Sequence, residues 1–281
     1  MAAQPLAAAN EAAKPWVSPA ASAPIAVPRT TDWGRALPFV GPVVLFIVWD
    51  LVVRLGLVKP ILLPPPLAAL GALANGLAGG ALLGDFVVTV WRTVQAFAIA
   101  AVIGMPLGVL LGSNEKAYRS VEFLIDFFRS TPSSALIPLF LLIFGITDVN
   151  KIAIAAFAAV LLVLFNSAYG VMNAKKTRVM AAQIMGVSRW HVFKDVLLME
   201  SLAQTFVGLR SAVSMALVIV IVAEMFIGSE TGLGHRIIDA QQVFNVQEMY
   251  CSILVTGALG YGLNLLFLLA EKRLIHWSGK A

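Results

Sequence analysis

The stretch Thr177–Gly208, TRVMAAQIMGVSRWHVFKDVLLMESLAQTFVG, lies between two long apolar segments and is itself amphipathic and basic. Val187, Trp190, Phe193 and Val196 recur at a spacing of three, so their side chains share one face of a helix. Charged and polar side chains occupy the other face. This pattern predicts a helical segment that connects two membrane spans and differs from both.

A glycine divides this stretch into two parts. Gly186 interrupts an Ala-rich helical run, and Ser188 can cap the helix that follows. We therefore expect two short helices joined at Gly186, lying under a membrane domain and presenting a shaped surface to a soluble partner. The alternative is a plain interfacial helix that rests on lipid headgroups and docks on no protein.

The composition indicates an integral membrane protein. Hydrophobic residues make up 59% of the 281 residues and charged residues 12%, with a mean hydropathy of +0.88. A soluble chain of this length needs more polar surface than that. Cys251 is the only cysteine, which excludes an internal disulfide framework and any multi-cysteine metal site. The spacing of the histidines suggests no metal site and no catalytic constellation.

Runs of apolar residues predict an all-α membrane protein with about six transmembrane helices. The expected spans are about 36–55, 86–111, 120–146, 152–169, 206–227 and 249–271. In the second span, Gly104, Gly108 and Gly112 are small enough to let a neighbouring helix approach closely. That face should therefore pack on another helix.

The chain is expected to consist of two tails and one membrane domain, in which loops connect the spans. Residues 1–31 are rich in Ala, Pro and Ser and lack the apolar core of a signal peptide, so we expect a disordered cytoplasmic tail. Residues 32–277 should form the membrane domain, with a cytoplasmic loop at about 174–204, and residues 278–281 a C-terminal tail. A short outer helix is expected at about 66–83 and a polar loop at 228–248.

The distribution of basic residues predicts that both termini are cytoplasmic. With that orientation, few basic residues face outward: Arg54, Lys59, Lys151 and Arg236. The cytoplasmic set is much larger: Lys14, Arg29, Arg35, Lys116, Arg119, Lys175, Lys176, Arg178, Arg189, Lys194, Lys272, Arg273 and Lys280. The orientation also places the 174–204 loop in the cytoplasm.

The third expected span is too polar in its middle to be a simple helix. Pro132 should break the helix, and neighbouring hydroxyl groups can bond the freed backbone groups. Arg129 and the hydroxyl residues Ser130, Thr131, Ser133 and Ser134 form a candidate solute site, because charge-assisted hydrogen bonds suit an oxyanion. The alternatives are that Arg129 reaches the inner headgroups or pairs with Asp126 or Glu122.

Four polar residues on other spans are further candidates. Asn166 lines the pathway or bonds between helices, and Arg210 serves as an inner gate or pairs with a loop carboxylate. Ser214, one turn deeper than Arg210, is assigned to the pathway. Glu224 and Arg92 should lie at a similar outer depth, so a structural ion pair between them is expected.

A motif in the cytoplasmic loop resembles a known family. Ala181-Ala182-x-x-x-Gly186 followed by Val196-x-Leu198 resembles the EAA signature of permease subunits of bacterial ABC importers. The run GVSRWHVFKDVLL and the later Gly208-Leu209-Arg210 are similar to the branch that imports nitrate, sulfonates and taurine. Met180 and Met199 stand where the signature usually has Glu and Pro.

This resemblance implies a type I ABC importer fold and a transport subunit that is not itself an enzyme. It implies a homodimer in the inner membrane, two cytoplasmic ATPase subunits that bind the ATP and Mg, and a periplasmic or lipid-anchored binding protein. The chain itself would hold no cofactor, and it lacks the phosphate-binding loop of an ATPase. The coupling residues implied for contact with the ATPase are Ala181, Ala182, Gly186, Val187, Ser188, Arg189 and His191.

The resemblance to this branch implies that the solute is a small anion, with aliphatic sulfonates such as taurine first. Nitrate, bicarbonate, aromatic carboxylates and pyrimidine precursors remain open. The alternative function is an ion-coupled secondary carrier without an ATPase. Such a carrier would require buried acidic residues at the centre of the bundle, and the central spans are nearly free of Asp and Glu.

Overall fold

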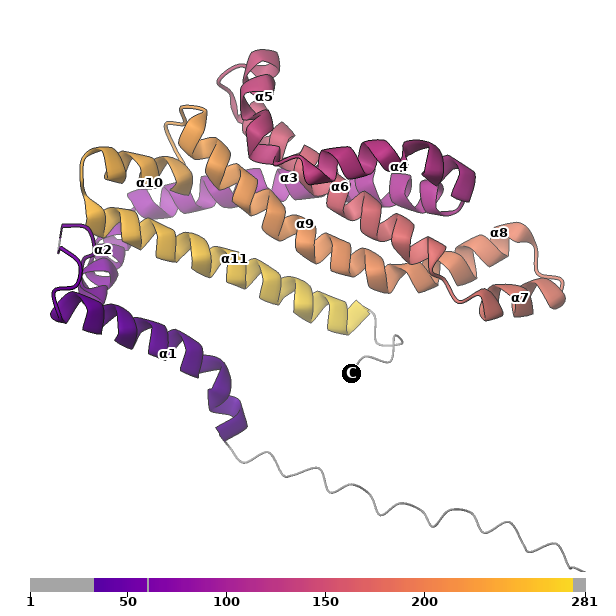
Figure 1. The fold of residues 1–281 in the computed structure, drawn as a ribbon, viewed down its shortest axis with the longest axis horizontal. Coiled ribbons are helices and arrows are strands. Elements are labelled where there is room, and N and C mark those ends of the chain that lie inside the picture. Colours follow the sequence, from indigo (N-terminus) through magenta and orange to yellow (C-terminus); the bar gives the residue numbers. More distant parts are fainter. Residues whose placement is uncertain (1–32, 60, 275–281) are drawn as a thin grey trace, which may run out of the picture. The chain divides into compact units, whose positions relative to one another are not determined.

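The computed structural model describes residues 33–59 and 61–274, and every regular element within them is a helix. The predicted tails at 1–31 and 278–281 lie outside the described residues. The chain divides into two units, residues 1–48 and 49–281, and the boundary falls within α1. The helices from α2 onward all belong to the second unit (Figure 1).

The helical elements follow one another with short connections. Their bounds are α1 Trp33–Arg54, α2 Pro66–Ala78, α3 Ala81–Gly112, α4 Glu115–Ser130, η1 Ser133–Leu136, α5 Ile137–Phe144, α6 Asp148–Met172, α7 Lys176–Ile184, α8 Arg189–His191, η2 Val192–Leu197, α9 Leu198–Phe226, α10 Leu233–Gln242 and α11 Val246–Leu274.

Within the described residues, four helical stretches are long and apolar enough to cross a membrane: α3, α6, the continuous stretch Arg189–Phe226 that ends in α9, and α11. The pair of α4 with the segment Ser133–Phe144 would make a fifth. The first expected span falls in α1, a helix of 22 residues that is not among these four. The described residues thus give four or five candidate spans where about six were expected.

The third expected span is broken, as the position of Pro132 predicted. α4 ends at Ser130, and the segment from Ser133 to Phe144 turns away from it by 91°. Asn114 caps the start of α4, where its side chain accepts hydrogen bonds from two backbone N–H groups. The expected long span is therefore two helical pieces with a sharp bend between them.

The polar loop expected at 228–248 contains a helix, so that prediction was wrong for its central part. α10 has an amphipathic pattern that polar composition concealed: Leu233, Ile237 and Ala240 are buried, and Gln241 and Gln242 are exposed. The outer helix expected at 66–83 ends earlier, at Ala78, because Gly79 and Gly80 separate it from α3.

The core is formed by α3, α6 and α9, which make the most extensive helix contacts in the second unit (Figure 1). Small residues set their close approach, as expected for Gly104, Gly108 and Gly112. A methyl group added to Gly108 would lie 2.4 Å from the carbonyl oxygen of Leu164 on α6. At Gly112 it would lie 2.6 Å from the carbonyl oxygen of Ala168.

We expect Gly108→Ala to destabilise the fold by about 1–3 kcal/mol, because the added methyl group forces α3 away from the α6 backbone. Thermal unfolding in mild detergent, followed by fluorescence-detected size exclusion, measures the effect. Gly84→Ala is the matched control, since Gly84 lies on the same helix with open space around it. Equal unfolding temperatures for the two variants would contradict this account of the core.

Candidate functional site

The 174–204 loop has the form expected from its sequence. α7 ends before Gly186, which adopts a left-handed conformation with φ of +75°. Ser188 then caps α8, where its Oγ accepts a hydrogen bond from the backbone N–H of His191 and lies 2.8 Å from Nδ1 of the same residue. The turn at Gly186 and the short helix before it are therefore confirmed, whereas the helix after the turn is not short, because it continues from Arg189 through to Phe226.

Large apolar side chains at the tip of this loop are exposed. Ile184 is 87% exposed, Met185 74% and Trp190 65%. Ala182, in contrast, is buried. Exposed apolar side chains grouped on one short segment are typical of a surface that contacts another protein or a lipid headgroup layer.

The remaining predicted coupling residues lie on the same tip. Ala181, Val187, Arg189 and His191 are all exposed. Trp190 and Phe193 stack with ring centroids 5.9 Å apart, which agrees with a shared face. The sequence did not predict that Val192–Leu197 forms a π-helix. Such widened turns inside helices occur frequently at functional sites.

Arg129 lies at the bend between α4 and η1 and has nearby partners. Its Nη1 lies 3.2 Å from Oδ1 of Asp126, which is one of the alternatives left open above. Its guanidinium carbon is 3.7 Å from the ring centroid of Phe165 on α6. The hydroxyls of Ser130 and Thr131 both donate hydrogen bonds to the carbonyl oxygen of Phe127. These groups bond within the described chain.

The other hydroxyls at the bend remain available. Ser133 and Ser134 lie in η1, and their side chains make no hydrogen bond to the described residues. Ser134 is exposed and Ser133 is half-buried. The bend therefore combines a cation with two hydroxyl groups that have no protein partner among the described residues.

Asn166 bonds between helices, as its alternative interpretation proposed. Its Oδ1 accepts a hydrogen bond from Nε2 of Gln204 on α9 at 2.9 Å, and its Nδ2 donates to the carbonyl oxygen of Leu162 at 2.8 Å. A methyl group added to Gly208 would lie 2.5 Å from the Asn166 side chain. Asn166 thus fills the contact between α6 and α9.

A groove of about 620 Å³ runs along α9 beside α6 and α11. Arg210 and Ser214 line it, and so do two polar residues that the sequence analysis did not single out, Ser211 and Asn264. Nη1 of Arg210 lies 3.7 Å from Oε2 of Glu271 on α11. Asn264 is exposed, and its side chain makes no hydrogen bond to the described residues.

Most polar groups of this groove are bonded within the chain. Ser211 and Ser214 donate hydrogen bonds to the carbonyl oxygens of Val207 and Arg210. The amide of Asn264 is unpaired among the described residues, which is costly in hydrocarbon, so its side of the groove is expected to border water or another protein. The groove therefore brings Arg210 and Ser214 together, whereas Arg129 and Asn166 are not among its lining residues.

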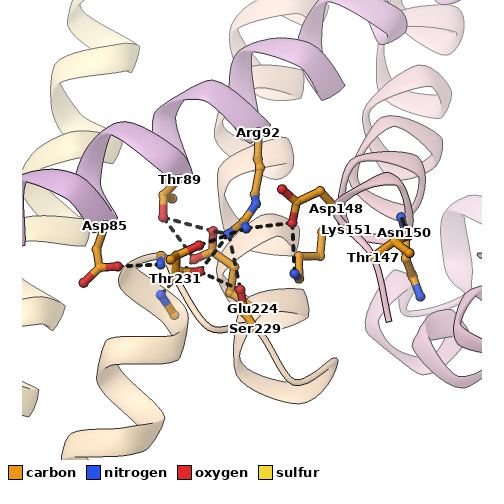
Figure 2. A network of polar contacts seen from close by, with 12 residues as sticks. Asp85, Thr89, Arg92, Thr147, Asp148, Asn150, Lys151, Glu224, Ser229 and Thr231 are labelled. Carbon is orange, nitrogen blue, oxygen red and sulfur yellow. Dashed lines mark hydrogen bonds and ion pairs between the residues drawn. The ribbon is translucent and has the colours of Figure 1, made fainter. Parts of the chain in front are cut away.

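A second polar cluster lies at the other end of α9, where Arg92 and Glu224 form the expected ion pair (Figure 2). Nη1 of Arg92 is 2.8 Å from Oε1 of Glu224, and Nη2 is 2.7 Å from Oδ1 of Asp148. Lys151 also pairs with Asp148, at 3.1 Å. Arg92 is 3% exposed and Glu224 is fully buried.

The segment 228–234 closes over this cluster. Nη1 of Arg92 donates to the carbonyl oxygen of Thr231 at 2.9 Å, and the backbone N–H of Gly234 donates to Oε2 of Glu224 at 2.9 Å. Gly232 has φ of +117°, and a methyl group there would lie 2.4 Å from the Glu224 carboxyl carbon. Only glycine fits between this backbone and the carboxylate.

The cluster extends to α10 and α11 through Arg236, whose guanidinium contacts Asp85 at 3.0 Å and Glu248 at 2.5 Å. Burial by itself would lower the pKa of Arg236. The hydrogen bonds to both carboxylates outweigh that effect and hold the pKa above its ordinary value. Arg236 therefore stays charged and ties the start of α3 to the last two helices.

Glu224→Gln should lower the free energy of unfolding by about 3–5 kcal/mol, because it removes the buried one of the two carboxylates that balance the charge of Arg92. Thermal unfolding in mild detergent measures this loss. Glu115→Gln removes an exposed ion pair with Arg119 and serves as the control, with stability near that of the parent chain. A Glu224→Gln protein as stable as this control would show that the pair is not needed.

The described residues contain no group of three or more His, Cys, Asp or Glu side chains that could hold a metal ion. Cys251 is buried.

Residues 104–276 match the family described as "Binding-protein-dependent transport system inner membrane component". The taurine transport system permease protein TauC of Escherichia coli (strain K12) is 28% identical over 84% of this chain and 88% of its own length. The bicarbonate transport system permease protein CmpB of Synechococcus elongatus is 27% identical, over 81% of this chain and 84% of its own.

Among solved structures, an inward-facing form of the MetNI methionine ABC transporter matches with a TM-score of 0.57 and 23% sequence identity. The match covers 69% of this chain and 95% of that one. At this level of identity the likeness concerns the fold.

Proposed function

Because this chain belongs to the family of inner membrane components of binding-protein-dependent transport systems, we propose that it moves a small anionic solute into the cell with energy from ATP. Proteins of this family are permease subunits and not enzymes, and they work with an ATPase and a solute-binding protein. The observation that carries the proposal is the exposed apolar tip of the 174–204 loop, which offers a docking surface.

The loop tip is proposed to contact the ATPase. Ala181 and Ala182 lie in the last turn of α7, and Gly186 and Val187 lie in the turn that follows. Ser188 caps the second helix, and Arg189 and His191 lie at its start. The turn is compact because Gly186 accepts a conformation that other residues resist. Ile184, Met185 and Trp190 would become buried in the contact, which accounts for their exposure in the isolated chain.

The assembly is proposed to contain two copies of this chain, two ATPase subunits that bind ATP and Mg, and a periplasmic or lipid-anchored binding protein. One chain supplies one set of helices and one coupling loop. When the ATPase subunits close on ATP, they would draw the two loops together and turn the helices outward. Release of the solute from its binding protein into the path, followed by hydrolysis, would complete a cycle.

The pathway is proposed to include the α9 groove and the bend of the third span. Arg210 and Ser214 line the groove, and Arg129 lies at the bend with Ser133 and Ser134. These cations favour an anion, since charge-assisted hydrogen bonds replace its water. Ser130, Thr131 and Asn166 complete the proposed set, although their side chains already bond to neighbouring groups.

The solute proposed first is an aliphatic sulfonate of the taurine type. The permeases named for taurine and for bicarbonate transport are similar to this chain to nearly the same degree, so nitrate, bicarbonate and carboxylates are further candidates. In such systems the binding protein selects the solute before it reaches the membrane. The substrate is therefore identified best from the ligand of the companion binding protein.

We expect Gly186→Leu to uncouple ATP hydrolysis from uptake, because a bulky residue with positive φ distorts the turn that contacts the ATPase. The measurement is mild-detergent purification of the tagged chain from native membranes, with mass spectrometry of the proteins that accompany it. The parent chain should retain an ATPase subunit at near one-to-one ratio, and Gly186→Leu should lose it or lose solute uptake.

Gly145→Leu is the matched control, because Gly145 also has positive φ, at +67°, and open space around it, but lies outside the loop. Normal uptake by Gly186→Leu would contradict the coupling role. A parent chain that purifies alone and transports without an ATPase would overturn the proposed function and favour an ion-coupled carrier.

Arg129→Ala should lower uptake of a taurine or nitrate probe by about tenfold or more, as expected for loss of a hydrogen bond to a charged ligand. Arg119→Ala is the control, since Arg119 lies on the same helix and pairs with Glu115 at the surface. Transport that is unchanged in Arg129→Ala would assign Arg129 to its contacts with Asp126 and Phe165.

A further inference from the structure

Glu200 lies in the first turn of α9 and holds the start of α7 across the loop. Its Oε2 accepts a hydrogen bond from the backbone N–H of Lys175 at 2.8 Å. Its Oε1 pairs with Nη1 of Arg178. One carboxylate therefore binds both the residue that precedes α7 and a side chain of its first turn.

The contact supplies something that α7 lacks. The N-terminus of α7 has no side-chain cap from Lys175 and no acidic residue in its first turn. A helix N-terminus carries unpaired N–H groups and a partial positive charge, and a carboxylate there is stabilising. Glu200 provides this negative charge from another helix.

Burial makes Glu200 the fixed member of the pair. Its side chain is 14% exposed, and that of Arg178 is 63% exposed. The loop 174–204 contains one other carboxylate, Asp195, which is exposed and makes no ion pair within the described residues. Glu200 is thus the one acidic group that links α7 to the membrane helix within this part of the chain.

The covalent connection from α7 to α9 is broken once and widened once. The glycine turn at Gly186 breaks the helix, and the π-helix Val192–Leu197 then widens the continuous helix that leads into α9. Neither segment has the regular hydrogen bonding of an α-helix. The contact between Arg178 and Glu200 bypasses both segments and joins α7 to α9 directly.

We propose that Glu200 is a positioning residue of the coupling step: through Arg178 and the N-terminus of α7, it carries a displacement of the cytoplasmic loop into α9. This inference rests on the proposed function, because that function supplies the displacement. It adds a carboxylate outside the loop tip, at a distance from the surface that contacts the ATPase. α9 also carries Arg210 and Ser214, so the movement would reach the groove directly.

The test follows α9 in the assembled complex. Met215 lines the groove and is exposed, so Met215→Cys in a Cys251→Ser background places a single thiol on α9. The chain is purified with its own ATPase into lipid nanodiscs. The rate of maleimide labelling is measured without nucleotide and after trapping with ATP and vanadate, and ATP hydrolysis is measured in parallel.

We expect the parent complex to change its labelling rate on trapping. Glu200→Gln, which keeps the side-chain size but removes the charge, should reduce that change by about fivefold or more, at the low end of coupling between sites. Arg178→Gln should have the same effect. The double variant should reduce the change in labelling rate no further than either single variant does, because both substitutions remove the same contact. The amount of ATPase that co-purifies should stay the same in all of them.

Glu115→Gln is the control, since it removes a surface carboxylate–arginine pair of the same kind from α4. Arg178→Gln removes the same contact from its more exposed side. It therefore tests the contact even if the Glu200 variant fails to fold. If both single variants change labelling as the parent does, Glu200 has no positioning role. A parent chain that retains no ATPase at all would instead contradict the proposed function, so the two failures are distinguishable.

Discussion

A buried arginine is the constraint on which one end of the helix bundle depends. Arg92 comes from within an apolar helix, where an unpaired cation is costly, and it is buried almost completely. Glu224 and Asp148 bind its two terminal nitrogens, and Lys151 pairs with Asp148 as well. The charges of these four side chains sum to zero. This balance requires that α3, α6 and α9 meet at one place.

Much of the fold could be predicted from the sequence where one residue type decides the outcome. Pro132 marked the break in the third span, Gly186 marked the turn that ends α7, and Gly108 marked the close contact between helices. The pair of Arg92 and Glu224 followed from their similar depth and opposite charge. Each of these features depends on a steric or electrostatic property of one residue or one pair.

Other parts depend on tertiary contacts that local patterns do not contain. α10 was expected to be a loop because its glutamines conceal the spacing of Leu233 and Ile237. The helix widens into a π-helix at Val192–Leu197, and no residue type in this segment indicates that it does so. Ser211 and Asn264 became candidates only because α9 and α11 place them beside one groove. The sequence is equally consistent with Asn166 as a pathway residue and as a link between helices. The hydrogen bond that it accepts from Gln204 is what identifies the link.

The seams between α3, α6 and α9 have a mechanical consequence. Gly108 and Gly112 lock α3 to α6 through backbone contacts, Gly170 and Gly208 lock α6 to α9, and the charged cluster joins the far ends. Helices held at both ends and along their length cannot slide past one another without losing close packing. In the proposed dimer, each copy of the chain is therefore expected to move as one rigid body, so that the opening forms between the two copies and not within one.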